Sequence, residues 1–184
     1  LSGLGQPGGG GGKHSAQLAG AHSGTGAVSS ASALPLDAVR YDRQRFPGGK
    51  DAYARYIGEA LDVMGVSDPA ARRNWTVGLM TAAARESTFN PLAVNVDPRD
   101  HNVQISTGAG PDGYPNRASR GGLQVIPETF ARHHQAGTST NLYDPVANVC
   151  ASMNYVMSRY RVAADGRNLA SVPQFNPGSA GGGY

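Results

Sequence analysis

The chain has 184 residues, only 16% of them charged, and a formal net charge of +3. This length suits one domain with a sizeable core. The sequence contains no Lys/Arg run with interleaved aromatic residues, the pattern that would indicate nucleic-acid binding. The single cysteine, Cys150, excludes an intrachain disulfide and a cysteine-based zinc site, and no apolar run reaches the roughly 18 residues of a membrane span.

The first 33 residues differ in composition from the rest of the chain. They are rich in Gly, Ser and Ala and show no sustained apolar period. Such a segment buries too little apolar surface to offset the entropy lost on ordering. We therefore expect a flexible linker at 1–33, a folded domain at 34–165, and a Gly/Pro-rich tail at 166–184.

Three long helices are predicted within the domain, besides a short helix that begins at Pro127. The stretch "KDAYARYIGEALDVMGV" repeats apolar residues at steps of three and four. Asp68 and Pro69 form a helix start, because Asp accepts from backbone N–H groups and Pro has none to leave unpaired; the helix reads "PAARRNWTVGLMTAAARES". Asp144 and Pro145 repeat the signal before "PVANVCASMNYVMSRY". This last helix carries an unbroken apolar stripe, so we expect it in the core with Cys150 as a small buried hydrophobic residue.

The stretch from Val96 to Ala118 is rich in Pro, Gly, Asn and Asp. These residues favour turns, so the stretch predicts a long loop, with a short hairpin at "HNVQIST". Loops of this length in compact domains tend to be functional or mobile.

One carboxylate stands out because of its position on the second helix. Trp75, Leu79, Ala82 and Glu86 fall at steps of four, three and four, so they share one helix face. Burial there would favour the protonated form of Glu86, which can act as a general acid. The alternative is that Glu86 caps the helix or pairs with Arg85 on the surface.

Three sequence blocks that follow one another along the chain favour the general-acid interpretation of Glu86 over the surface one. "ESTFNP" begins at Glu86, "SRGGLQVIPET" begins at Ser119, and "DPVANVCASMNY" begins at Asp144. With these blocks, roughly residues 50–165 resemble the soluble-type (SLT) lytic transglycosylase family, which shares the lysozyme-like fold with goose-type lysozyme. The resemblance implies a mainly α (α+β) fold with a small irregular or short-stranded loop region. The wider frame is similar to a variant in mycobacterial and actinobacterial secreted proteins and actinophage tape-measure proteins.

The resemblance also implies roles for individual residues. Glu86 matches the family's essential acid. Further positions match residues that orient the site, line the substrate cleft or support it: Ser87, Ser119, Gly121, Gly122, Gln124, Thr129, Asn148 and Tyr155. In this group the two glycines would let backbone approach the sugar, and Tyr155 would supply an aromatic ring from the following helix.

The activity implied by the resemblance is cleavage of peptidoglycan between N-acetylmuramic acid and N-acetylglucosamine. Glu86 would protonate the bridging oxygen, and the C6 hydroxyl of the muramic acid would attack C1 to give 1,6-anhydromuramic acid. An intramolecular nucleophile can be favoured by about 7 kcal/mol or more. No second carboxylate, metal or cofactor is then required.

The sequence departs from the family pattern in two places. About two dozen residues separate the first two blocks, where the family often has a short link. This loop carries Asp97, Asp100, His101 and Asp112, any of which could serve as base for water and give a hydrolytic lysozyme instead. The family's "AYN" signature also has only the loose counterpart "PQFNPG", with Phe175 and Asn176.

Two further motifs could suggest a metal site, but the residue pattern of each argues against metal binding. His133 and His134 are adjacent on a helix, so they point about 100° apart, and no paired His/Asp spacing accompanies them. "DPRDHN" lacks the alternating ligands and central Gly of a calcium loop.

A rival from another class is a non-catalytic peptidoglycan-binding or structural module. The expected partner is the peptidoglycan glycan strand, with no nucleic acid and no membrane span, in a monomeric domain that belongs to a secretion or phage-tail assembly. The expected location is extracellular or in the cell wall, or in the virion tail if the chain is phage-encoded.

Overall fold

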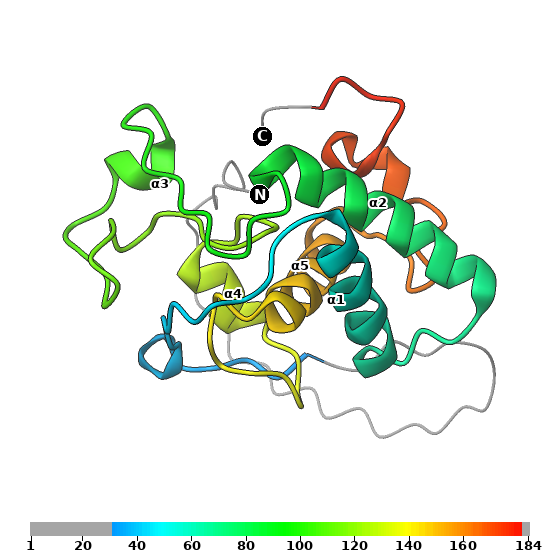
Figure 1. The fold of residues 1–184 in the computed structure, drawn as a ribbon, viewed down its shortest axis with the longest axis horizontal. Helices are drawn as coiled ribbons and strands as arrows, with labels where there is room; N and C mark the ends of the chain where they lie inside the picture. Colours follow the sequence, from blue (N-terminus) through cyan, green and yellow to red (C-terminus); the bar gives the residue numbers. More distant parts are fainter. Residues whose placement is uncertain (1–30, 182–184) are drawn as a thin grey trace.

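The computed structural model describes residues 31–181, and this range is mainly helical (Figure 1). Its helices are, in chain order, η1 (Leu36–Ala38), α1 (Lys50–Val63), α2 (Pro69–Ser87), α3 (His101–Gln104), α4 (Pro127–His133), α5 (Pro145–Tyr160), η2 (Leu169–Ser171) and η3 (Pro173–Phe175). Strand pairing within the described range is limited to isolated bridges. The predicted mainly α fold is confirmed.

Helix α5 forms the centre of the core. Nearly every residue from Pro145 to Val156 is buried, and the helix contacts both α1 and α4. Helix α2 packs on α1, and its Trp75 and Leu79 are fully buried. Figure 1 shows α5 between α4 and α1, with α2 next to α1. A helix apolar on most of its faces is stable only when neighbours cover it, as α1 and α4 do here.

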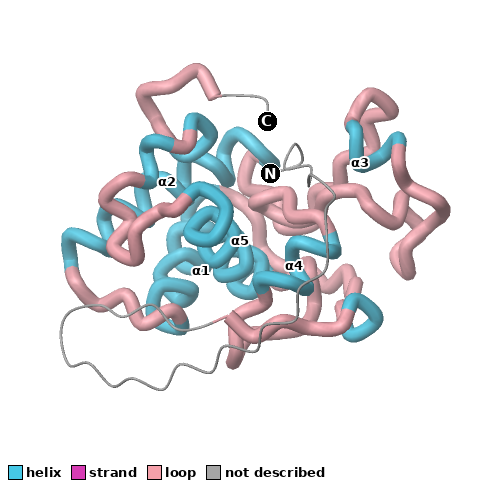
Figure 2. The backbone as a smooth tube through the Cα atoms, turned by 180° about the vertical axis from the view of Figure 1, so that it is seen from behind, coloured by secondary structure: helices cyan, strands magenta, loops and turns pink. Residues whose placement is uncertain are grey.

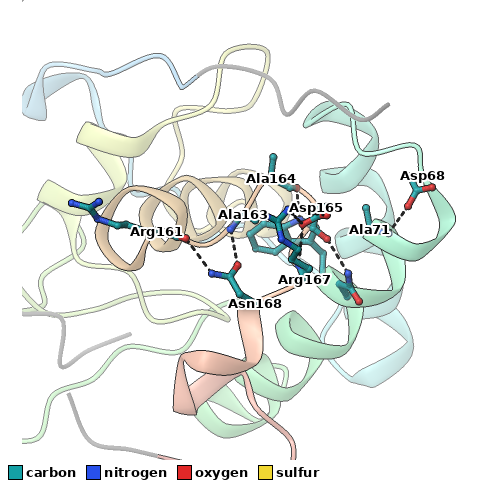
Figure 3. Close-up of polar contacts among 10 residues, drawn as sticks. Asp68, Ala71, Arg161, Ala163, Ala164, Asp165, Arg167 and Asn168 are labelled. Carbon is teal, nitrogen blue, oxygen red and sulfur yellow. Dashed lines mark hydrogen bonds and ion pairs between the residues drawn. The ribbon is translucent and has the colours of Figure 1, made fainter. Parts of the chain in front are cut away.

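Both predicted helix starts are confirmed. The Asp68 carboxylate accepts from the Ala71 N–H at 2.9 Å (Figure 3), and Asp144 accepts from the Ala147 N–H at the same distance. Cys150 is fully buried in α5, as predicted. Burial raises the pKa of its thiol to about 12, so the thiol stays neutral and acts as a packing group.

The hairpin predicted at "HNVQIST" is wrong. Residues 101–104 form the short helix α3, because Asp100 accepts from the N–H groups of Asn102 and Val103 and so caps a helical turn. The loop that carries α3 extends away from the main group of helices, as both Figure 1 and Figure 2 show.

The segment expected as a C-terminal tail is packed against α2. After α5 the chain turns back through contacts of Asn168 with Arg161 and Ala163 (Figure 3), and the Trp75 indole N–H donates to the Ala164 carbonyl at 2.9 Å. The side chains that follow, Leu169, Val172 and Phe175, are at most 2% exposed. Burial of these three apolar side chains explains why the folded part continues beyond residue 165.

Gly78 makes this close packing possible. A Cβ at Gly78 would lie 2.3 Å from Leu169 Cδ2, so only glycine allows η2 to approach α2. At the other end of the chain, residues 1–30 of the expected linker lie outside the described residues. The Ser32 N–H donates to the His134 carbonyl, so the described part of that segment contacts the folded domain.

Candidate active site

Glu86 lies in the last turn of α2 and is partly buried, whereas Trp75 and Ala82 on the same face are fully buried. The helix ends directly after it with two left-handed residues, Thr88 (φ 50°) and Phe89 (φ 59°). Two such non-glycine residues in succession cost conformational energy, which other contacts must offset.

The contacts that hold this turn come from Ser87 and from the start of α1. The Ser87 hydroxyl donates to the Ala83 carbonyl and accepts from the Asn90 N–H, both at 3.1 Å. The Phe89 carbonyl accepts from the Gly49 N–H at 2.9 Å, and the Phe89 ring lies 5.8 Å from that of Tyr53. Ser87 therefore fixes the chain directly after Glu86.

Glu86 and its neighbour Arg85 both bind the C-terminal segment. The Gln174 amide Nε2 donates to Glu86 Oε1 at 2.8 Å. The Arg85 guanidinium donates to the carbonyls of Pro173, Gln174 and Ser179. The end of α2 and residues 173–179 thus form one connected polar surface around the carboxylate.

The second sequence block forms a tight turn. The Ser119 hydroxyl donates to Gln124 Oε1 at 3.0 Å. Gln124 Nε2 donates to the carbonyls of Ala93 and Gly121 at 3.1 and 2.8 Å, and its backbone is left-handed (φ 52°). Gln124 therefore closes the turn internally and also attaches it to the segment that follows Glu86.

Backbone contacts join the same two segments. The Gly121 N–H donates to the Ala93 carbonyl at 2.8 Å, and the Asn95 N–H donates to the Ser119 carbonyl at 3.0 Å. Val94 and Arg120 form an isolated antiparallel bridge. Residues 93–95, which follow the first block in sequence, are therefore in direct contact with the second block.

The two glycines of the block have internal packing roles. A Cβ at Gly121 (φ 83°) would lie 2.5 Å from Asn148 Nδ2, and a Cβ at Gly122 would lie 1.9 Å from the Tyr53 hydroxyl oxygen. Their missing side chains leave room for Asn148 and Tyr53. The structure thus gives a packing reason for these glycines, in addition to the expected approach of a sugar.

Asn148 links the third block to the second. Its Oδ1 accepts from the Leu123 N–H at 3.0 Å, and its Nδ2 donates to the carbonyls of Arg120 and Leu142, both at 3.2 Å. All three hydrogen bonds are buried, so the Asn148 amide stabilises the 119–124 turn from the interior of the protein. Thr129 is 8% exposed on α4.

Tyr155 has a different environment from the other expected site residues. Its ring lies edge-on to His133 (5.4 Å) and Tyr160 (6.1 Å), between α4 and the end of α5. Burial raises the pKa of the Tyr155 hydroxyl, and burial followed by the nearby Arg132 lowers the pKa of His133 to about 4. Tyr155 therefore belongs to a partly buried aromatic cluster, and its ring contacts lie outside the 119–124 turn.

Each aspartate of the long loop has local partners. Asp97 binds the Arg99 guanidinium at 2.7 Å, and the side-chain hydrogen bond from Arg99 lowers the pKa of Asp97 to about 2. Asp100 caps α3 and accepts from the Asn95 amide at 3.2 Å. His101 is exposed on α3.

Asp112 forms the central ion pair of the loop. Arg120 Nε and Nη2 donate to its two oxygens at 2.9 and 2.8 Å, and the Tyr143 hydroxyl donates at 2.6 Å. Burial acts to raise the pKa of Asp112, but the hydrogen bonds from Arg120 and Tyr143 outweigh it, so the pKa is lowered. Sequence reasoning missed this pair, because no local pattern links positions 112 and 120.

His134, a candidate metal ligand by sequence, has hydrogen-bond partners among the described residues. The two ring nitrogens of His134 contact the carbonyls of Ser32 and Ser139, both at 3.1 Å. Residues 31–181 contain no group of three or more His, Cys, Asp or Glu side chains placed to hold a metal ion. No helix in that range is long and apolar enough to cross a membrane.

Comparison with known proteins supplies the family. The family described as "Transglycosylase SLT domain" matches residues 68–179, which is more than half of the chain and includes all three blocks. "Uncharacterized protein YqbO" of Bacillus subtilis (strain 168) is 38% identical over 87 residues. That match covers 47% of this chain but only 5% of the relative's length.

No solved structure gives a significant match. The family match begins at Asp68, the N-cap of α2, and extends through the segment that binds Arg85 and Glu86. The chain therefore belongs to the SLT transglycosylase domain family, a lysozyme-like family of lytic transglycosylases that act on peptidoglycan.

Proposed function

We propose that this chain is a peptidoglycan lytic transglycosylase that cleaves the β-1,4 bond between N-acetylmuramic acid and N-acetylglucosamine, with Glu86 as its acid and base. The observation that carries the proposal is the position of Glu86. This partly buried carboxylate lies in the last turn of α2, accepts a hydrogen bond from the Gln174 amide, and falls inside the range matched by the family.

The proposed reaction uses one carboxyl group in two steps. Protonated Glu86 gives its proton to the bridging oxygen as the bond from that oxygen to C1 of the muramic acid breaks. The C6 hydroxyl oxygen of the same sugar then bonds to C1, and its proton passes to the Glu86 carboxylate. The products are 1,6-anhydromuramic acid and a free 4-hydroxyl, and the enzyme returns to its starting state.

The local partners of the loop aspartates favour this reaction over hydrolysis. A hydrolase that activates water needs a second carboxylate to hold it. Asp97 is bound to Arg99, Asp100 caps α3, and Asp112 is paired with Arg120. Recruiting one of them would require breaking contacts that stabilise the loop, so a muramidase is the second candidate.

A non-catalytic module is the third candidate, and the geometry around Glu86 favours it least. A binding module has no need for a partly buried acid held by a dedicated amide donor. We further propose that the chain acts outside the cell or in the cell wall, or in a virion tail, where peptidoglycan is accessible.

The deciding experiment is digestion of purified peptidoglycan, with mass spectrometry of the soluble muropeptides. Anhydro-muramic ends support the proposal, reducing ends establish the muramidase, and no release refutes both enzymatic readings. Glu86→Gln should abolish release, and Glu59→Gln, at an exposed position on α1, should leave it unchanged. Continued release by Glu86→Gln would show that another group is the acid.

A further inference from the structure

One residue that contacts Glu86 comes from a part of the chain far away in sequence. Gln174 lies 88 positions after Glu86, in η3, and its Nε2 donates to Glu86 Oε1 at 2.8 Å. Nothing in the sequence pattern around "PQFNPG" indicates a role for this amide. The contact exists because residues 166–181 fold back along α2.

The backbone of Gln174 is firmly held on both sides. Val172 and Phe175 are 2% and 1% exposed in the core. Between them, the Arg85 guanidinium donates to the carbonyls of Pro173 and Gln174 at 2.9 and 3.2 Å. The backbone that carries the Gln174 side chain is therefore held in place, and the amide reaches Glu86 from an ordered segment.

The chemistry of this contact is directional. An amide nitrogen can donate a hydrogen bond but cannot take a proton, so the Glu86 oxygen that faces it does not exchange a proton with Gln174. The last torsion of a Glu side chain is broad and nearly free, and a short hydrogen bond to one oxygen fixes the plane of the carboxyl. Fixing that plane also fixes the position of Oε2, the other oxygen.

We propose that Gln174 is a positioning residue for Glu86, which holds Oε1 so that Oε2 carries the proton toward the glycosidic oxygen. This inference rests on the proposed function. After the proton has been given, the same N–H forms a charge-assisted hydrogen bond to the carboxylate and holds it for its second step as base. A misplaced acid lowers the rate of the chemical step, and we expect substrate binding to be retained because Gln174 acts through Glu86.

The test is a comparison of Gln174→Met with the wild-type chain on soluble glycan strands. Methionine keeps the length of the side chain and removes the amide. We expect kcat to fall by about 10- to 100-fold with KM unchanged, and the unfolding midpoint to stay the same. Gln104→Met, at an exposed position on α3, is the matched control and should keep the wild-type kcat.

The outcomes separate this inference from the proposed function. If the wild-type chain releases no muropeptides, the proposed function fails. If the wild-type chain is active and Gln174→Met keeps the wild-type kcat, only the positioning role is overturned. A rise in KM with an unchanged kcat would overturn it as well. Should Gln174→Met unfold, Gln174→Glu replaces the donor with an acceptor of the same shape, and a wild-type kcat in that variant would refute the role.

Discussion

Arg120 and Asp112 form a fully buried bidentate ion pair, with side chains 0% and 1% exposed. Arg120 belongs to the 119–124 turn and Asp112 to the long loop, so the pair attaches the loop to the candidate active site. Arg43 extends this network, because it donates to the Tyr143 hydroxyl at 2.9 Å and lies over the rings of Tyr114 and Tyr143. Arg120 also lies over the Tyr41 ring at 5.2 Å.

Asp112→Asn should be strongly destabilising, since it leaves the Arg120 charge buried without its counter-ion. Removing one partner of a buried pair costs about 3–5 kcal/mol, and urea unfolding at neutral pH measures it. Asp97→Asn removes the exposed pair with Arg99 and should have a much smaller effect. Equal effects of the two changes would mean that burial of the Asp112 pair contributes nothing to stability.

Stability should also depend on pH through His133. Its pKa is about 4 in the folded chain and 6.5 in its ordinary state, so below pH 6.5 the unfolded chain binds a proton that the folded chain does not. The free energy of unfolding should therefore fall as the pH is lowered from about 6.5 to about 4. His133→Phe, which keeps a ring against Tyr155, should flatten this part of the curve; an unchanged slope would assign the effect to another group.

Gly122→Ala should disrupt the turn, because its Cβ would lie 1.9 Å from the Tyr53 hydroxyl oxygen and 2.3 Å from Cζ. Overpacking of this kind costs about 1–3 kcal/mol or more, and peptidoglycan release should fall with it. Gly108→Ala, with no atom within 4 Å of the added Cβ and no positive φ, is the control. The two unfolding midpoints give the comparison, and a neutral Gly122→Ala would show that Tyr53 is free to move.

Tyr53→Phe should stabilise the protein. The Tyr53 hydroxyl is buried and finds no hydrogen-bond partner among the described residues, so it carries an uncompensated desolvation cost. Removing it should increase the free energy of unfolding by about 1 kcal/mol, measured by urea unfolding. A loss of stability in Tyr53→Phe would reveal a partner for the hydroxyl, such as a bound water.

The helices could be predicted well from local patterns. The Asp-Pro starts at 68 and 144 and the apolar stripe of α5 depend on neighbours within a few residues, and all were confirmed. The hairpin at "HNVQIST" was wrong because the Asp100 side chain offers a helix cap, which outweighs the β-branched residues that follow. The three ordered blocks also sufficed to identify the family.

The structure does not bring all the expected site residues together: Glu86 and Ser87 lie at the end of α2, and Thr129 lies on α4. Ser119, Gly121, Gly122, Gln124 and Asn148 come together at one turn, whereas Tyr155 joins His133 and Tyr160 in an aromatic cluster. Spacing along a helix gives the face on which a side chain lies. Residue spacing does not give the element against which that face packs.

The sequence by itself determined the three long helices α1, α2 and α5, the family and the identity of Glu86 as the candidate acid, because each depends on residues close together in the chain or on motif order. Only the tertiary structure decided what surrounds that acid. The contacts Asp112–Arg120 and Gln174–Glu86 join separate segments, and the second spans 88 positions through a segment whose composition predicted a tail. The Gln174–Glu86 contact forms because Leu169, Val172 and Phe175 bury apolar surface against the domain, and the two polar partners meet as a consequence.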